Sequence, residues 1–297
     1  DDLDSNNLNN RNRVLIFRNV RNQVPALDTE IPPYISRCPV CGGQADVVLG
    51  QPTFDKVEPL AVNARTMRNP TAVASDGVRL VVADTDYNRV LIWNSIPSTN
   101  GQPADVVLGQ ENFTTIKRIT TDNRSFRGPQ GVWIANGRLF VADTQNHRVL
   151  VWNSIPTQNH AAADLVLGQP NFTTAPEVDL TRATIDARAD SMLNPVSVTS
   201  DGTRLYVSDL GHNRVLIFNS LPTRNAQPAD VVIGQPDFTT AVANNSQRLC
   251  PSNGERDGQP TYPLLCGATL DFPRFALSDG RRLFISDGGN DRVLVYH

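Results

Sequence analysis

Short apolar runs separated by turn residues dominate the chain. The clearest run, "RVLVW" at 148–152, is apolar at every position after its arginine, and near copies lie at 89–93, 214–218 and 292–296. A strand that shows no polar face has to be buried on both faces, so its sheet needs a neighbour on each side. The pattern therefore predicts small β-sheets that stack face to face.

Each repeat contains four such runs, which we expect to form one antiparallel sheet. In one repeat they cover 131–135, 138–143, 148–152 and 164–168. An Asp-Gly or Asn-Gly dipeptide joins the first two runs of every repeat, as at Asn136-Gly137. This is the strongest short hairpin signal, because both central residues need positive φ. The chain is predicted to be all-β and built from repeated four-stranded units.

The stretch "VADTQNHRVLVWNS" contains an Asn-His-Leu pattern at Asn146, His147 and Leu150. Together with its turn chemistry and regular spacing, it resembles the NHL-repeat β-propeller family, in the long-repeat type of secreted or surface-associated bacterial proteins. The resemblance implies a propeller of about four to six four-stranded antiparallel blades. It would cover residues 11–297 after a polar tail at 1–10. Relatives include scaffolds, RNA binders, sensor ectodomains and lyase- or lactonase-like enzymes, so the resemblance says little about activity.

The blade count is open. The first unit supplies the third and fourth strands without the first two, and the last unit supplies the first three without the fourth. Three arrangements fit: the first unit's fourth strand completes the last blade, the chain is a fragment, or end strands are donated to a neighbouring copy, which would build a filament. We expect closure within one chain, because an unpaired strand edge invites aggregation.

Every repeat ends its second strand with Asp and begins its third with Arg. These residues are Asp84, Arg89, Asp143, Arg148, Asp209, Arg214, Asp287 and Arg292. Chemistry repeated in every blade is expected to be structural. We predict that the Asp caps the following turn through backbone amides and that the Arg pairs with carboxylates between blades. The sequence offers no catalytic motif such as a P-loop, a dinucleotide fingerprint or a nucleophile elbow.

His147 and His212 lie in consecutive turns of the repeat, so both side chains are expected at the same end of the ring. They are the candidates for metal ligands or a general base, although the sequence shows no further ligands near them. We predict no bound cofactor, with Ca²⁺ or Zn²⁺ as the alternative.

The four cysteines form two close pairs, Cys38 with Cys41 and Cys250 with Cys266. Two local disulfides are expected. A shared four-cysteine zinc site is an alternative, but the two pairs fall in loops at opposite ends of the strands. A redox dithiol at Cys38 and Cys41 is a further alternative. Disulfides favour an extracellular or cell-surface location.

Charge and loop length bear on function. The net charge of −3, with only two lysines among 27 basic residues, gives no field for nucleic acid. No apolar run approaches the roughly 18 residues of a membrane span.

The loops at 182–194 and 240–272 vary most, and function is expected there. We predict a non-catalytic extracellular binding or scaffold protein that uses these loops for a protein partner or for self-assembly. The alternative is a metal-dependent lyase or lactonase-like enzyme at the channel mouth.

Overall fold

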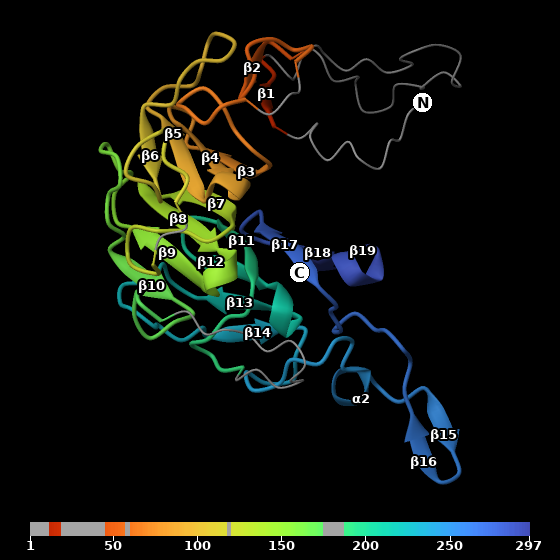
Figure 1. Cartoon of the computed structure of the whole chain (residues 1–297). Helices are drawn as coiled ribbons and strands as arrows, with labels where there is room; N and C mark the ends of the chain where they lie inside the picture. The colour runs from red at the N-terminus through yellow and green to blue at the C-terminus, as the bar shows by residue number, and fades with distance from the viewer. Residues whose placement is uncertain (1–11, 19–44, 57–59, 118–119, 175–186) are drawn as a thin grey trace, which may run out of the picture.

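The computed structural model describes residues 12–18, 45–56, 60–117, 120–174 and 187–297 of the chain. In this part, the strands form three four-stranded antiparallel sheets, one three-stranded sheet and two two-stranded sheets. The large sheets follow one another along an arc that runs from β1 to β19 (Figure 1). The prediction of an all-β propeller with four-stranded antiparallel blades is confirmed.

Consecutive strands pair as neighbours within each blade. Blade 2 contains β3 (Pro70–Ser75), β4 (Leu80–Asp84), β5 (Arg89–Trp93) and β6 (Val106–Leu108). Blade 3 contains β7 (Pro129–Ala135), β8 (Arg138–Asp143), β9 (Arg148–Trp152) and β10 (Leu165–Leu167). Blade 4 contains β11 (Pro195–Ser200), β12 (Leu205–Asp209), β13 (Arg214–Phe218) and β14 (Val231–Ile233).

The blades at the two ends of the arc are incomplete. Blade 1 contains β1 (Val14–Ile16) and β2 (Val47–Leu49), and blade 5 contains β17 (Pro273–Ser278), β18 (Leu283–Asp287) and β19 (Arg292–Tyr296). β2 pairs with β1, and no strand in the described part of the chain pairs with the outer edge of β19. The expectation that β2 completes the last blade is therefore wrong for this structure, in which blades 1 and 5 lie at opposite ends of the arc.

The all-apolar runs are buried on both faces where a blade has two neighbours. β5, β9 and β13 are buried along their whole length, and one hydrophobic core lies between each pair of adjacent blades. The prediction that the apolar strands are buried on both faces fails at the end of the arc. There β14 and β19 are partly exposed, and Val293 is 64% exposed. No further blade among the described residues covers this end.

The turns between the first two strands of each blade differ from the predicted geometry at three of four positions. Only Asn136-Gly137 has positive φ at both residues, +50° and +74°. The three Asp-Gly turns have positive φ at the glycine only. Their loops are two residues longer, and Asp76 Oδ1, for example, accepts hydrogen bonds from the amides of Val78 and Arg79. In these longer turns the aspartate side chain stabilises the loop by accepting backbone hydrogen bonds, so the aspartate itself does not adopt a positive φ.

The loop between the third and fourth strands covers the outer edge of the preceding blade. The Asn159 side chain accepts a hydrogen bond from the amide of Val107 in β6, and the His160 amide donates to the Val107 carbonyl. Asn100 and Asn225 repeat the contact on β2 and β10. The outer strands are thus protected from pairing with other chains.

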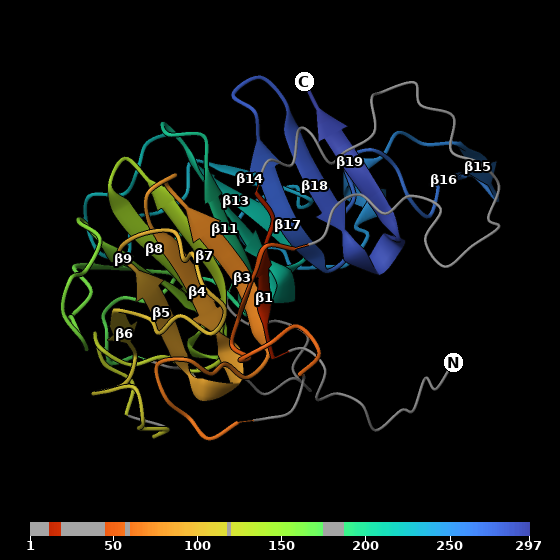
Figure 2. The same ribbon diagram turned by 90° about the horizontal axis from the view of Figure 1, so that it is seen from above.

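One insertion departs from the blade pattern. It holds a single helical turn, α2 (Ser246–Leu249), and a hairpin of β15 (Gly254–Arg256) and β16 (Gln259–Thr261). The hairpin extends away from the blades, as the view from above shows (Figure 2). No helix in the described ranges is long and apolar enough to span a membrane.

Candidate recognition surface

The repeated Asp and Arg form buried ion pairs inside each blade. Arg148 Nε lies 2.8 Å from Asp143 Oδ2, and both side chains are fully buried. The other Asp143 oxygen accepts a hydrogen bond from the Arg127 amide. The Arg148 guanidinium also donates to three carbonyls, those of Phe172, Asp122 and Ser125. One arginine thus joins the third strand to the loops before and after its own blade.

The same network recurs in the other blades. The Nε to Oδ2 distance is 2.7 Å for Arg89 with Asp84 and 2.8 Å for Arg214 with Asp209 and for Arg292 with Asp287. Each pair lies within one sheet, at directly opposite register positions. The expectation that the arginines pair between blades is therefore wrong. The carboxylates also bond the loop that enters the first strand, and not the amides of the following turn.

His147 holds two blades together. Its Nδ1 accepts a hydrogen bond of 3.1 Å from the Asn194 amide of the next blade. Asn88 and Asn213 occupy the same repeat position and accept the equivalent amide hydrogen bond through Oδ1. His212 has a different contact, because its Nδ1 lies 2.8 Å from Asp209 Oδ2. Both imidazoles therefore take part in structural hydrogen bonds. The described ranges contain no group of three or more His, Cys, Asp or Glu that could hold a metal ion.

Acid is expected to destabilise the protein through His147. Burial lowers the pKa of His147 to about 4; Asp209 opposes this shift, and Arg127 and His212 add to it. The unfolded histidine has a pKa near 6.5. Between these values the unfolded chain binds a proton that the folded chain does not, so stability falls as the pH drops from about 6.5 to 4.

Replacing His147 by Asn keeps the hydrogen-bond acceptor and removes the titration. We expect His147→Asn to match the wild type in chemical denaturation at pH 7, and to be more stable by roughly 2–3 kcal/mol at pH 4.5. His297→Asn, in an exposed residue, serves as the control. Equal acid sensitivity of His147→Asn and the wild type would contradict this assignment.

The structure joins Cys250 and Cys266 in a disulfide, with their Cα atoms 5.9 Å apart. Cys38 and Cys41 lie outside the described residues, so their expected disulfide and the alternatives for them stay predictions. The disulfide closes the insertion at 240–272 near its base.

The base of this insertion is fixed to blades 4 and 5. The Asn213 side chain donates to the Ala241 carbonyl, and the side chains of Asn244 and Asn290 exchange two hydrogen bonds of 2.9 and 2.8 Å. Asn213 and Asn290 belong to the turns that precede the third strands. The insertion therefore lies at the same end of the blades as these turns.

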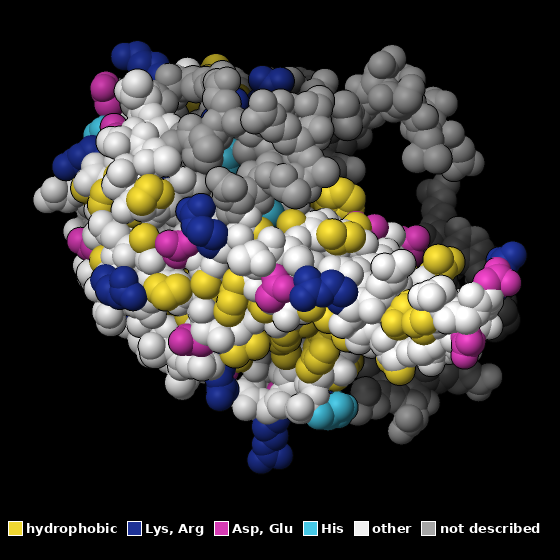
Figure 3. Space-filling model, turned by 90° about the horizontal axis from the view of Figure 1, so that it is seen from below, with side chains coloured by type: hydrophobic (Ala, Val, Ile, Leu, Met, Phe, Trp, Pro, Cys, Tyr) yellow, Lys and Arg dark blue, Asp and Glu magenta, His cyan; other side chains and the backbone are white. Residues whose placement is uncertain are grey.

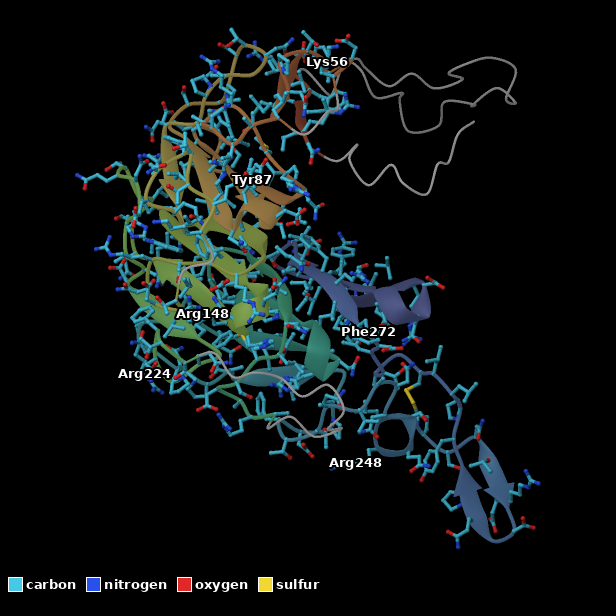
Figure 4. The ribbon with its side chains drawn as sticks, in the orientation of Figure 1. Lys56, Tyr87, Arg148, Arg224, Arg248 and Phe272 are labelled. Carbon is cyan, nitrogen blue, oxygen red and sulfur yellow. A yellow bond between two sulfur atoms is a disulfide. The ribbon has the colours of Figure 1, made fainter. Side chains whose placement is uncertain are left out.

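The insertion exposes apolar side chains both at its base and beyond the disulfide. Leu264 is 87% exposed, and Val242, Leu265 and Phe272 are exposed as well. Figure 4 shows Arg248 and Phe272 on the two sides of the insertion, with the disulfide between them and the hairpin. A rigid loop with exposed apolar residues is typical of a recognition surface.

The loop at 182–194 behaves differently. Residues 182–186 lie outside the described residues. Of the remainder, Ala187, Met192 and Leu193 are buried, and Met192 belongs to the core between blades 3 and 4. Ala187, Met192 and Leu193 therefore pack against the blades, whereas the Arg188 side chain is 55% exposed, so the expectation that this loop forms a contact surface stays a prediction.

A cavity of ≈ 370 Å³ lies where the innermost strands β3, β7, β11 and β17 meet. The register of each inner strand shifts immediately after its first proline. The residues at these shifts all line the cavity: Thr71, Gln130, Val196 and Arg274. A bulge re-aims a side chain locally. We did not predict this cavity from the sequence. Its signal there is the residue that follows the first proline of each inner strand, because this residue differs from blade to blade while the proline is always present.

Sequence comparisons identify the type of repeat. The family described as "NHL repeat" matches residues 126–152. NHL repeat-containing protein 2 of Gallus gallus is 36% identical over 77 residues, and that of Bos taurus is 40% identical over 72. These segments cover 26% and 24% of this chain but only 10% and 9% of the relatives.

Structural comparisons give distant similarities. A structure titled as a nidogen/laminin complex has a TM-score of 0.41 at 13% identity, over 81% of this chain and 64% of that one. A periplasmic gluconolactonase of Pseudomonas aeruginosa has a TM-score of 0.42 at 18% identity, over 78% of this chain and 57% of that one. Residues 126–152 thus match an NHL repeat, and the described part of the chain has the stacked four-stranded antiparallel sheets of a β-propeller.

Proposed function

We propose that this chain is a protein-binding scaffold that presents the insertion at 240–272 from a rigid propeller. The observation that carries the proposal is the exposure of Leu264, which is 87% exposed beside Leu265 on a loop closed by a disulfide. An apolar side chain held in this way has no packing role in the chain itself. Burial of such side chains against a partner is a main source of binding energy.

The attachment of the insertion supports a binding role. The disulfide and the hydrogen bonds of Asn213 and Asn244 restrict the loop before any partner arrives. Restriction in advance lowers the entropy that binding has to overcome. The exposed strands β15 and β16 also offer backbone edges to which an extended peptide can add a strand.

The proposed location is extracellular or at the cell surface. The Cys250–Cys266 disulfide supports it, since disulfides persist in oxidising compartments.

The alternative is a metal-dependent lyase or lactonase-like enzyme at the channel mouth, beside the central cavity. The residues that line it supply one charged side chain, Arg274, and no carboxylate, imidazole or thiol group. Metal-dependent hydrolysis draws its ligands and its base from such groups. The chemistry of this lining therefore favours the binding function.

Charge on the insertion is expected to abolish partner binding. Leu264→Asp places a carboxylate where the proposed contact is apolar, so capture of a protein partner from an extract of the source organism should fall at least tenfold. Val78→Asp is the matched control, because Val78 is 60% exposed in a turn far along the chain. Quantitative mass spectrometry of the captured proteins measures how much partner each of the two variants binds. Equal capture by the two variants would rule out this surface.

A further inference from the structure

The central cavity of ≈ 370 Å³ has the size and the mixed lining of a small-molecule site. Apolar side chains from all four innermost strands contribute to its walls, among them Val73, Trp133, Val198 and Phe275. Val73 and Phe275 are 52% and 44% exposed, so no other side chain in the described part of the chain covers them fully. An apolar group of a ligand can therefore pack against these walls.

One hydroxyl group at this cavity is buried and has no hydrogen-bond partner. Ser197 lines the cavity and is 3% exposed, and its Oγ atom bonds no other group among the described residues. The same register position holds Ala72 in blade 2 and Gly131 in blade 3, so a blade does not need a hydroxyl group there. A buried polar group without a partner is costly. A ligand in the cavity would supply the missing partner.

Arg274 stands beside this serine and brings the single charge of the cavity's described lining. Thr199 of β11 donates a hydrogen bond to the Ala276 carbonyl of β17. Ser197 and Arg274 each lie two residues earlier in these strands, so they occupy the same level of two adjacent blades. The serine hydroxyl and the guanidinium group can therefore contact one ligand together.

The guanidinium group of Arg274 is available for such a contact. Among the described residues, no hydrogen bond or ion pair engages it. On the face seen from below, by contrast, Lys and Arg side chains lie among Asp and Glu side chains (Figure 3). Gly288 leaves room for the arginine, because a Cβ atom there would lie 2.9 Å from its Cγ and 3.1 Å from its Nε. A threonine, which blade 2 has at this position as Thr85, would displace the arginine.

Trp133 adds a further hydrogen-bond donor to the cavity. The other two tryptophans, Trp93 and Trp152, donate their indole N–H groups to backbone carbonyls. The Trp133 indole lines the cavity and has no such acceptor within the part of the chain that the structure describes. The lining thus offers donors from Ser197, Trp133 and Arg274 and no carboxylate to pair with them. This combination favours a ligand with acceptor oxygens and a negative charge.

We propose that the central cavity binds a small organic carboxylate with an apolar body. The carboxylate accepts hydrogen bonds from Arg274 and Ser197, and the apolar body packs against Trp133 and Phe275. Arginine recognises a carboxylate through two parallel hydrogen bonds, and burial of the body adds to the affinity. The described lining has no carboxylate, imidazole or thiol group for acid–base chemistry, so the molecule is bound without being converted. This site is independent of partner binding at the insertion.

Titration of the full chain with benzoate tests the proposal. The readout is the set of three indole N–H signals in a nuclear magnetic resonance spectrum. Benzoate should shift the Trp133 signal in a saturable manner and leave those of Trp93 and Trp152 in place, since these two indoles already donate to carbonyls. Benzamide has the same shape without the charge and should bind at least about tenfold more weakly. No saturable shift up to about 10 mM benzoate, or equal affinity for benzamide, would overturn the proposal.

Two substitutions separate the roles of the charge and the hydroxyl group. Arg274→Gln should weaken benzoate binding about 10- to 100-fold and Ser197→Ala about two- to tenfold, because they remove a charged and a neutral hydrogen bond. Ser197→Ala introduces the residue that blade 2 has at this position, so the variant should fold. Arg281→Gln, at an exposed arginine outside the lining, is the matched control. Wild-type affinity in either cavity variant, or an equal loss in the control, would overturn the proposal.

Discussion

Replacing Arg148 by alanine is expected to lower the free energy of unfolding by about 3–5 kcal/mol. The substitution leaves the buried Asp143 without its ion pair and three loop carbonyls without their donor. Burial already raises the pKa of Asp143 against the attraction of Arg148, so the isolated carboxyl will take up a proton. The loss of stability then comes from the carbonyl groups that remain in the core without a hydrogen-bond donor.

Chemical denaturation, followed by tryptophan fluorescence, measures this loss. The matched control is Arg282→Ala. Arg282 also lies 2.7 Å from an aspartate, Asp279, but its side chain is 51% exposed. A surface pair of this kind contributes roughly 0–1 kcal/mol. If the two variants were equally stable, the arginine network would not be the element that joins the loops to each blade.

Removing the disulfide is expected to have the second largest effect, confined to the insertion. The double variant Cys250→Ala/Cys266→Ala frees a loop whose ends are 16 residues apart. In the chain-entropy model, closing a loop of this size is worth about 3 kcal/mol. Local opening of residues 251–265 should therefore become roughly a hundredfold more frequent.

Hydrogen–deuterium exchange measures this opening directly. Amides of β15 and β16 should exchange faster in the double variant, and those of β8 and β9 should keep their rates, because the cores around β8 and β9 contain no residue of 251–265. Unchanged exchange at β15 and β16 would mean that hydrogen bonds at the base, such as that of Asn244, restrain the insertion by themselves.

The blade architecture follows from local patterns in the sequence. The run at 148–152 is apolar throughout because blades cover both of its faces, and the same is true at 89–93 and 214–218. The run at 292–296 has the same pattern but is exposed on one face. The apolar pattern of a strand is the same whether one or two blades cover it in the structure. The pattern could therefore not predict where the arc ends.

Other features depend on geometry over long distances. The arginine contacts are mostly with backbone carbonyls, which leave no trace in the residue types. Closure of the ring depends on the accumulated rotation from blade to blade, which no single repeat encodes. The loop at 182–194 looks variable in sequence, yet Met192 fills a gap between blades. Length alone does not separate packing loops from recognition loops.

Site-specific photo-crosslinking tests the central claim most directly, namely that the insertion at 240–272 is where a protein partner binds. A photoreactive amino acid is introduced at Leu264 in one variant and at Val78 in another, since both side chains are exposed. We predict a discrete covalent adduct with one partner protein at position 264 and none at position 78. Adducts of equal yield at both positions, or at position 78 alone, would contradict the assignment of this insertion as the recognition surface.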